Sequence, residues 1–384
     1  MEHEADAIER QGGPPGAWDG AARIPGGECA AGTAARTAPR PYNIAPMMTD
    51  EMLRAQLPHT LRQLDLPGLG ELYRGKVRDN YSRGDQIVMV TTDRVSAFDH
   101  VLGTIPFKGE ILSRLTAFWF DKVRDIAPIH VVEVPDPSVM VVKRAKPFPV
   151  EIIVRGYITG SLWRDYQAGK AGAYGIAWPA GLRKDQRFDA PVLTPSTKAE
   201  YGKHDEPISE AEILRQGLVS PALWAEAKAV ALRLFQRGQE WAAQRGLVLV
   251  DTKYEMGTMA EEDGSTGRRG EAKAEQSKDK LVVIDEIHTP DSSRYWLAEG
   301  HAERFQKGEE QRMLDKENIR QWLIQEHGFS GQGTPPPLTD DVRVMLARTY
   351  VNLYERLTGQ TFTSEVGSVE ARIARNLTAR GYVR

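Results

Sequence analysis

Apolar residues along this 384-residue chain fall into short continuous runs and into stripes with helical spacing. Two runs, 247–250 and 281–284, have the length and apolar character of buried strands. Residues 108–124 and 221–245 place apolar side chains on one helix face, and Ser220 is a typical cap for the second helix. The same patterns predict further strands at 86–92, 139–142 and 150–154, and further helices at 49–64, from about Ser161, at 339–357 and at 371–380.

Acidic residues follow each of the two apolar runs directly. Because alternate side chains of a strand share a face, Asp251, Lys253 and Glu255 are expected to point the same way. If the two runs pair as a hairpin, Asp285 can face Glu255. Two carboxylates beside a lysine suit Mg²⁺ carrying a nucleotide phosphate, whereas solvated strand ends are the alternative interpretation.

Two weaker patterns also point to phosphate. Gly75 and Lys76 stand between two strand-like segments, as in a loop folded over phosphates, although most such pairs are plain turns. Arg155 and Ser161 surround a predicted helix start, which favours an anion site, and a capping serine beside a surface arginine is the alternative. Residues 93–99 are expected to form a polar loop, and residues 169–207 are expected to be rich in loops. Within the second segment, the polar stretch 193–206 is either a substrate lid or exposed surface.

Two polar or low-complexity segments interrupt the patterned part of the chain. Residues 1–48 are rich in Ala, Gly and Pro without an apolar period, so we expect a disordered extension. Its acidic residues and its lack of an apolar core argue against a targeting peptide. The charged segment 257–280 is expected to be a solvated insertion between the two strands, dispensable like the extension.

Composition mainly excludes classes of protein. The length allows two domains or one large one, and the net charge of −3 gives no argument for nucleic acid or an anionic membrane. No apolar run approaches the length of a membrane span. The single cysteine, Cys29, rules out an internal disulfide and fits a reducing compartment, and no Cys/His cluster suits zinc.

Six stretches, taken together and in order, resemble the phosphoribosylaminoimidazole-succinocarboxamide synthase (SAICAR synthetase) family of purine biosynthesis, in its longer form. The resemblance implies an α/β (α+β) fold in which an N-terminal antiparallel-sheet nucleotide lobe (49–147), similar to that of protein kinases, precedes a larger α/β lobe (148–384) with C-terminal helices. ATP would bind in the cleft between the lobes. The six stretches are 73–79, 92–99, 150–162, 196–206, 251–257 and 285–294.

The resemblance also implies the reaction. The carboxylate of carboxyaminoimidazole ribotide (CAIR) would be joined to the amine of L-aspartate by a cytoplasmic ligase that uses ATP and Mg²⁺. A carboxylate is a poor electrophile, and phosphorylation makes it an acyl phosphate that an amine can attack. Metal ions, a lysine and arginines can stabilise that transfer without a side-chain nucleophile. The partners would be small molecules alone, with a monomer expected and a dimer as the alternative.

Individual residues receive roles from the resemblance. The implied catalytic residues are Lys76, Lys253, Glu255 and Asp285, of which Glu255 and Asp285 would be the metal ligands. The implied ATP-binding residues are Arg74, Gly75, Lys76, Val77, Arg78, Lys146 and Lys253. The implied CAIR-binding residues are Asp99, Glu151, Arg155, Ser161 and Arg294. The residues that hold L-aspartate stay open, and the candidates are Ser96, Lys198, Lys203 and His204.

Two other classes of protein compete with a ligase. A small-molecule kinase would bind the same nucleotide, but the chain lacks an H-R-D-x-x-x-x-N loop and a D-F-G motif. A non-catalytic nucleotide-binding protein would not need Lys76, Glu255 and Asp285 together. Aspartate-dependent release of ADP distinguishes the ligase from both.

Overall fold

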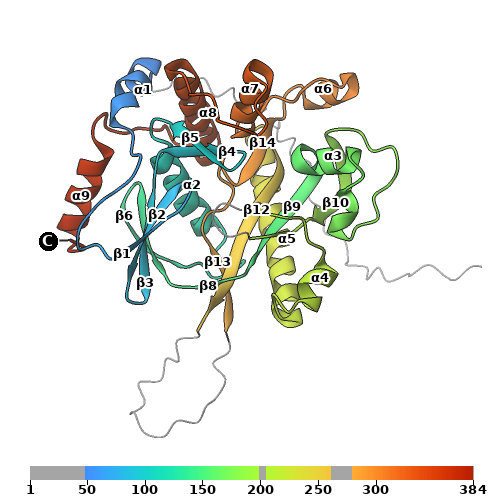
Figure 1. Cartoon of the computed structure of the whole chain (residues 1–384), viewed down its shortest axis with the longest axis horizontal. Coiled ribbons are helices and arrows are strands. Elements are labelled where there is room, and N and C mark those ends of the chain that lie inside the picture. Colours follow the sequence, from blue (N-terminus) through green and yellow to red (C-terminus); the bar gives the residue numbers. More distant parts are fainter. Residues whose placement is uncertain (1–47, 199–204, 261–278, 384) are drawn as a thin grey trace, which may run out of the picture. The chain divides into compact units, whose positions relative to one another are not determined.

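A five-stranded antiparallel sheet is formed entirely by residues 71–143 (Figure 1). The structure is a computed structural model and describes residues 48–198, 205–260 and 279–383. The strand order is β1-β2-β3-β7-β6. The bounds are β1 Glu71–Arg74, β2 Arg78–Arg83, β3 Gln86–Thr91, β6 Val131–Asp136 and β7 Val139–Lys143.

Both faces of this sheet are covered, which explains why its inner strands read as continuous apolar runs. Val88 and its same-face neighbours pack against α9 (Val369–Ala379), near the C-terminus. Met89, on the opposite face, packs with Met140 and with a residue of α2 (Lys108–Lys122). The C-terminal helix therefore belongs to the same packing unit as the first sheet.

The second sheet has seven strands and is organised around β9 (Val150–Ile158) and β12 (Leu247–Met259), which pair antiparallel. Helix α5 (Pro221–Ala243) contacts both central strands. All pairs of named strands in the described residues are antiparallel, which agrees with the antiparallel sheet expected for the N-terminal part. The other strands of this sheet are β8 Lys146–Pro147, β10 Gln186–Leu193, β11 Ser196–Thr197, β13 Lys280–Ile284 and β14 Ser293–Leu297.

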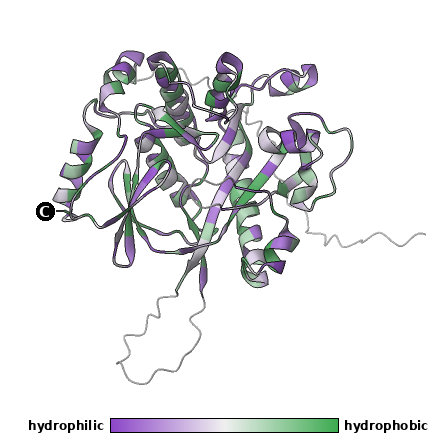
Figure 2. Ribbon diagram, in the orientation of Figure 1, coloured by the Kyte–Doolittle hydropathy of each residue, from purple (hydrophilic) through white to green (hydrophobic). Residues whose placement is uncertain are grey.

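The remaining elements connect and cover the two sheets. Helices α5 and α8 bury one side and expose the other, as the two colours along them show in Figure 2. No helix in the described ranges is both long enough and apolar enough to cross a membrane. These elements are α1 Asp50–Gln56, η1 Leu57–His59, β4 Arg94–Ala97, β5 His100–Thr104, α3 Gly160–Gln167, η2 Ala171–Tyr174, α4 Glu210–Arg215, α6 His301–Lys307, α7 Glu317–His327 and α8 Asp340–Thr358.

Three segments differ from the sequence-based expectations. The helix expected over 49–64 ends at Gln56, and a short 3₁₀ turn containing Pro58 follows, because proline lacks the N–H that continues a helix. The expected polar loop at 93–99 is largely the β4 strand of a β4–β5 hairpin. The loop-rich stretch 169–207 contains the eight-residue strand β10.

The two apolar runs at the centre of the sequence do pair as a hairpin. Glu255 lies opposite Ile284 and Met259 lies opposite Lys280 in the β12–β13 register. The first strand is longer than its apolar run, because β12 continues to Met259. The expected insertion 257–280 therefore begins and ends inside the hairpin, and its central part, 261–278, lies outside the described residues.

The described residues from 48 onward belong to one compact unit, and the change from the first sheet to the second falls between β7 and β8. A division into two lobes at residue 147 stays a prediction. The expected extension 1–48 lies outside the described residues except for Met48. That residue is fully buried, and its carbonyl accepts a hydrogen bond from Arg348.

Met48 is expected to stabilise the fold measurably. Replacing it with alanine should lower the free energy of unfolding by about 2–5 kcal/mol, since a buried methionine would leave a cavity. Met345→Ala is the matched control, because Met345 is 41% exposed on α8 and should change stability by no more than about 0.5 kcal/mol. Denaturant unfolding of both variants tests this, and equal stabilities would show that Met48 does not belong to the core.

Candidate active site

Two polar cavities adjoin each other between the ends of the central strands. The larger has a volume of about 520 Å³ and the smaller about 340 Å³. Their linings are mostly charged, so both suit anionic or zwitterionic ligands. They share a boundary, formed by Glu151, Asp205, Lys253, Asp291 and Lys316.

Two arginines and one aspartate form one end of the larger cavity. Asp251 on β12 lies opposite Arg155 on β9 and opposite Arg294 on β14, so the sheet register places both arginines beside one carboxylate. Arg155 Nη1 donates to Asp251 Oδ2 at 3.0 Å, and Arg294 donates to the same oxygen. Arg155 Nη2 also donates to Ser161 Oγ at 3.1 Å, in the first turn of α3.

Burial and neighbouring charges act differently on the two arginines of this end. Burial lowers the pKa of Arg155, and the nearby Arg294 lowers it further, against the opposite effect of Asp251. Burial opposes the charge of Arg294 too, but Asp251 and Glu317 outweigh it and raise the pKa. Two guanidinium groups beside one carboxylate, with a serine hydroxyl and a helix N-terminus, are arranged to bind a phosphate group.

Gly160 makes room for Arg294 at this end. Its φ of +58° lies in the left-handed region, and a Cβ built there would collide with the Arg294 guanidinium. Only glycine avoids both problems, because it has no side chain and adopts positive φ readily. The position of Arg294 therefore depends on a glycine in the neighbouring element.

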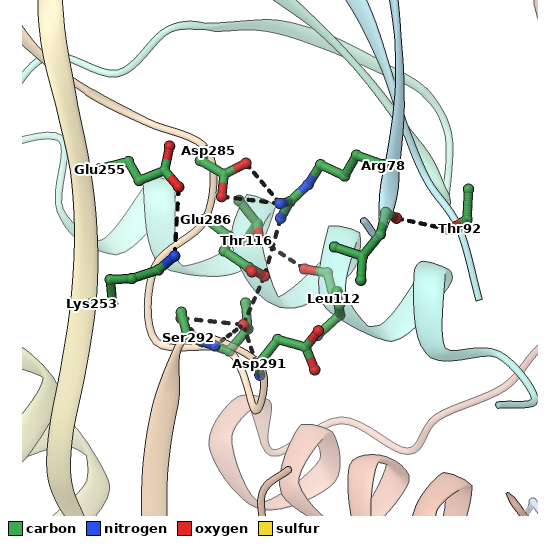
Figure 3. A network of polar contacts seen from close by, with 12 residues as sticks. Arg78, Thr92, Leu112, Thr116, Lys253, Glu255, Asp285, Glu286, Asp291 and Ser292 are labelled. Atoms are coloured by element: carbon green, nitrogen blue, oxygen red, sulfur yellow. Dashed lines mark hydrogen bonds and ion pairs between the residues drawn. The ribbon is translucent and has the colours of Figure 1, made fainter. Parts of the chain in front are cut away.

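The smaller cavity is formed by the 75–78 loop and by the segment that follows β13. Figure 3 shows Arg78 reaching the acids of that segment, at 2.7 Å from Asp285 and 3.2 Å from Glu286. Burial raises the pKa of Asp285 to about 7, and Glu255 and Glu286 add to this effect while Arg78 opposes it. Burial is therefore the main cause of this shift, and the two neighbouring carboxylates reinforce it.

The backbone holds Asp285 in a fixed orientation. Its φ of +65° is unusual for a residue other than glycine, and its N–H donates to His130 Nε2 at 3.2 Å. Burial lowers the pKa of His130 to about 3, and Arg78 contributes, so the ring is neutral and can accept this bond. A strained conformation held by a buried partner is typical of a functional position.

Lys253 connects the two cavities. Its Nζ atom lies 2.7 Å from Glu151 Oε1 and 3.7 Å from Glu255 Oε1. Lys198 forms a second ion pair with Glu255. Burial opposes ionisation of Glu255, but Lys253 and Lys198 outweigh it and lower its pKa to about 2. Glu255 is therefore a carboxylate at neutral pH, facing the cavity.

The smaller cavity offers two carboxylates to a hard cation such as Mg²⁺, but not a complete set of protein ligands among the described residues. Within the described residues no group of three or more His, Cys, Asp or Glu side chains is arranged to hold a metal ion. Glu255 and Asp285 nevertheless line the same cavity. Two carboxylates fit Mg²⁺, which usually takes one or two protein carboxylates and completes its shell with phosphate and water oxygens.

The structure brings most of the expected site residues together. Asp99 ion-pairs with Lys76 and so connects the larger cavity to the smaller one. Arg74 and Lys146 line neither cavity; Arg74 pairs with Asp65 at 2.6 Å. Two aspartate candidates, Lys203 and His204, lie outside the described residues. The expected site residues that line the smaller cavity are Gly75, Lys76, Val77, Arg78, Ser96, Glu151, Lys198, Lys253, Glu255 and Asp285.

A buried ionic cluster at the boundary of the cavities was not expected from sequence. Asp291 lies 2.9 Å from Lys108 and 3.9 Å from Lys316, and Tyr350 of α8 donates to it at 2.6 Å. Asp291 and Glu286 lie inside the 285–294 stretch, so that motif could have indicated them. No local sequence pattern marks Lys108 or Lys316 as a site residue, because only the tertiary fold brings them to Asp291.

Two adjoining charged cavities on an antiparallel α/β fold define a protein that binds two anionic small molecules side by side. A family model described as SAICAR synthetase matches residues 71–335. A phosphoribosylaminoimidazole-succinocarboxamide synthase of Legionella pneumophila (strain Lens) is 45% identical over 84% of this chain and 98% of its own length. The synthase of Bacteroides fragilis (strain YCH46) is 44% identical over 83% of this chain and 98% of its own length.

Solved structures agree with these relatives. A SAICAR synthase from Saccharomyces cerevisiae, complexed with SAICAR, has a TM-score of 0.66 and 30% identity, covering 79% of this chain and all of its own. A type-2 SAICAR synthetase in complex with ADP, at 22% identity and a TM-score of 0.55, has the same fold and covers 77% of this chain and all of its own. The chain belongs to the SAICAR synthetase family. Its activity is that of phosphoribosylaminoimidazole-succinocarboxamide synthase, an ATP-dependent ligase of purine biosynthesis.

Proposed function

We propose that the smaller cavity binds the phosphates of ATP, that the larger binds CAIR, and that the ligation occurs at their shared boundary. The observation that carries this proposal is the continuity of the two cavities at Glu151 and Lys253. The phosphate-binding arginines lie at one end and the Lys76 loop at the other. A ribotide anchored by its phosphate would therefore present its carboxylate toward the nucleotide.

The residues divide into three groups under this proposal. Arg155, Ser161 and Arg294 bind the ribotide phosphate, because the two guanidinium groups and the Ser161 hydroxyl lie together at one end of the larger cavity. Lys76 and Arg78 bind nucleotide phosphates from the loop between β1 and β2. Lys253 and Glu151 face the reacting carboxylate at the boundary, where the lysine compensates developing charge.

The chemistry has two steps. A carboxylate oxygen of CAIR attacks the γ-phosphorus of ATP, the bond to ADP breaks, and an acyl phosphate forms. The neutral amine of L-aspartate then attacks the carbonyl carbon, the bond to the phosphate oxygen breaks, and the nitrogen loses a proton to give the amide. Mg²⁺ held by Glu255 and Asp285 would neutralise phosphate charge when bound.

The setting of the enzyme is also part of the proposal. Both ligands assigned to the cavities are small molecules, and purine biosynthesis places such a ligase in the cytoplasm. We propose a monomer, with a dimer as the alternative. Size-exclusion chromatography with light scattering tests the monomer, and a stable dimer would contradict it.

An isotope experiment tests the reaction. ADP is expected to form only when CAIR and L-aspartate are both present, or much faster than with either alone. With ¹⁸O in the CAIR carboxylate, one labelled oxygen should leave in the released phosphate, because it bridges carbon and phosphorus in the intermediate. Mass spectrometry of the phosphate provides the measurement, and phosphate without label would remove the acyl-phosphate mechanism.

A further inference from the structure

Lys316 lies at the boundary of the two cavities with a distant counter-ion that it shares with Lys108. It lines both cavities at their boundary, and its side chain is 15% exposed. Its nearest carboxylate, Asp291, lies 3.9 Å away and already has the closer partner Lys108 at 2.9 Å. Tyr350 also donates to Asp291, so this carboxylate is well satisfied without Lys316.

The other charged groups near Lys316 act in both directions. Burial lowers the pKa of Lys316 to about 8, and Arg320 and Lys108 lower it further, whereas Asp291 and Glu286 oppose this effect. Arg320 has its own partner in Glu317, at 2.8 Å. A buried ammonium group with a shared, distant counter-ion is costly unless an anion completes the site.

The position of Lys316 indicates which of the three reactants it would bind. Under the proposed function, the ribotide phosphate occupies the Arg155 and Arg294 end, and the triphosphate occupies the Lys76 end. Lys253 is paired with Glu151 beside the CAIR carboxylate. The third reactant is an amino acid with two carboxylates, and it must reach the same boundary. Lys316 is the cation of that boundary that the other two ligands leave unassigned among the described residues.

We infer that Lys316 binds a carboxylate of L-aspartate and that Asp291 is the positioning residue that holds Lys316 toward the boundary. This inference rests on the proposed function, because it assumes the places of ATP and CAIR. Lys108 and Tyr350 keep Asp291 in place from α2 and α8.

Lys316→Met tests the inference, because it removes the charge and keeps most of the volume. The KM for L-aspartate is expected to rise roughly 10- to 150-fold, as for the loss of one charge-assisted hydrogen bond. The KM values for ATP and CAIR should stay within about threefold. Succinate, which has both carboxylates but no amine, should lose its inhibition of the variant in parallel, since Lys316 is proposed to bind a carboxylate.

Controls separate this result from a folding defect and from failure of the proposed function. Lys307→Met is the matched control, because Lys307 is 56% exposed on α6 and lines neither cavity. Lys316→Gln is the second variant if Lys316→Met does not fold. An unchanged KM for L-aspartate, or a larger rise for CAIR or ATP, would overturn the inference while the wild-type enzyme remains active. Absence of wild-type ADP release would instead overturn the proposed function.

Discussion

Asp285→Asn is expected to lower kcat by about 10²–10³-fold, the usual effect of removing one group that stabilises charge in a transition state. The change keeps the shape of the side chain and removes its charge. Asp285 lines the smaller cavity, where its carboxylate pairs with Arg78 and lies near Glu255. Without that charge, the site loses one of its two proposed ligands for Mg²⁺.

The measurement is kcat at saturating substrates, with thermal stability determined in parallel. Arg78 keeps Glu286 as a partner at 3.2 Å, so the variant should still fold. Asp189→Asn is the matched control, because Asp189 is exposed on β10 and lines neither cavity. Wild-type kcat for Asp285→Asn at ordinary Mg²⁺ concentrations would count decisively against a metal-binding role.

Arg294→Ala is expected to raise the KM for CAIR by roughly 10- to 150-fold, as for the loss of one charge-assisted hydrogen bond. Arg294 is the better target of the two phosphate-binding arginines. Its removal leaves Asp251 paired with Arg155 at 3.0 Å and Glu317 paired with Arg320 at 2.8 Å, so no buried carboxylate loses its last partner. The KM values for ATP and L-aspartate should change little, since neither ligand is placed at this end.

Gly160→Ala provides an independent route to the same site. A methyl group at residue 160 should displace the Arg294 guanidinium and raise the KM for CAIR without removing the charge. Gly169→Ala is the control for backbone strain, because Gly169 has φ +70° and no atom within 4 Å of a Cβ. If the KM for ATP rose most in Arg294→Ala, the arginine would belong to the nucleotide site.

The sequence predicted the parts of the site that local patterns carry. The alternation of Asp251, Lys253 and Glu255 was readable because strand geometry repeats every two residues. The hairpin with 281–284 followed from two apolar runs of matched length, and the register places Glu255 opposite Ile284. Both helices of strong periodicity, 108–124 and 221–245, formed within two residues of their expected bounds.

What could not be predicted depends on contacts between segments far apart in the chain. The ion pair of Lys108 with Asp291 joins residues 183 positions apart, and no local pattern marks a lysine that will be buried. The polar residues Asp93 and Arg94 predict a loop at the point where β4 begins, yet both residues are buried. Asp93 accepts backbone hydrogen bonds from Leu61 and Gly109, so its polarity serves the fold.

The register of the β12–β13 hairpin has a practical consequence for protein engineering. Five paired positions, from Glu255 opposite Ile284 to Met259 opposite Lys280, separate the acids of the smaller cavity from the far end of the hairpin. A one-residue slip would turn every side chain of a strand to the other face, so a slip in this pairing is strongly disfavoured. An epitope tag placed between residues 259 and 280 is therefore expected to leave the spacing of the acids unchanged.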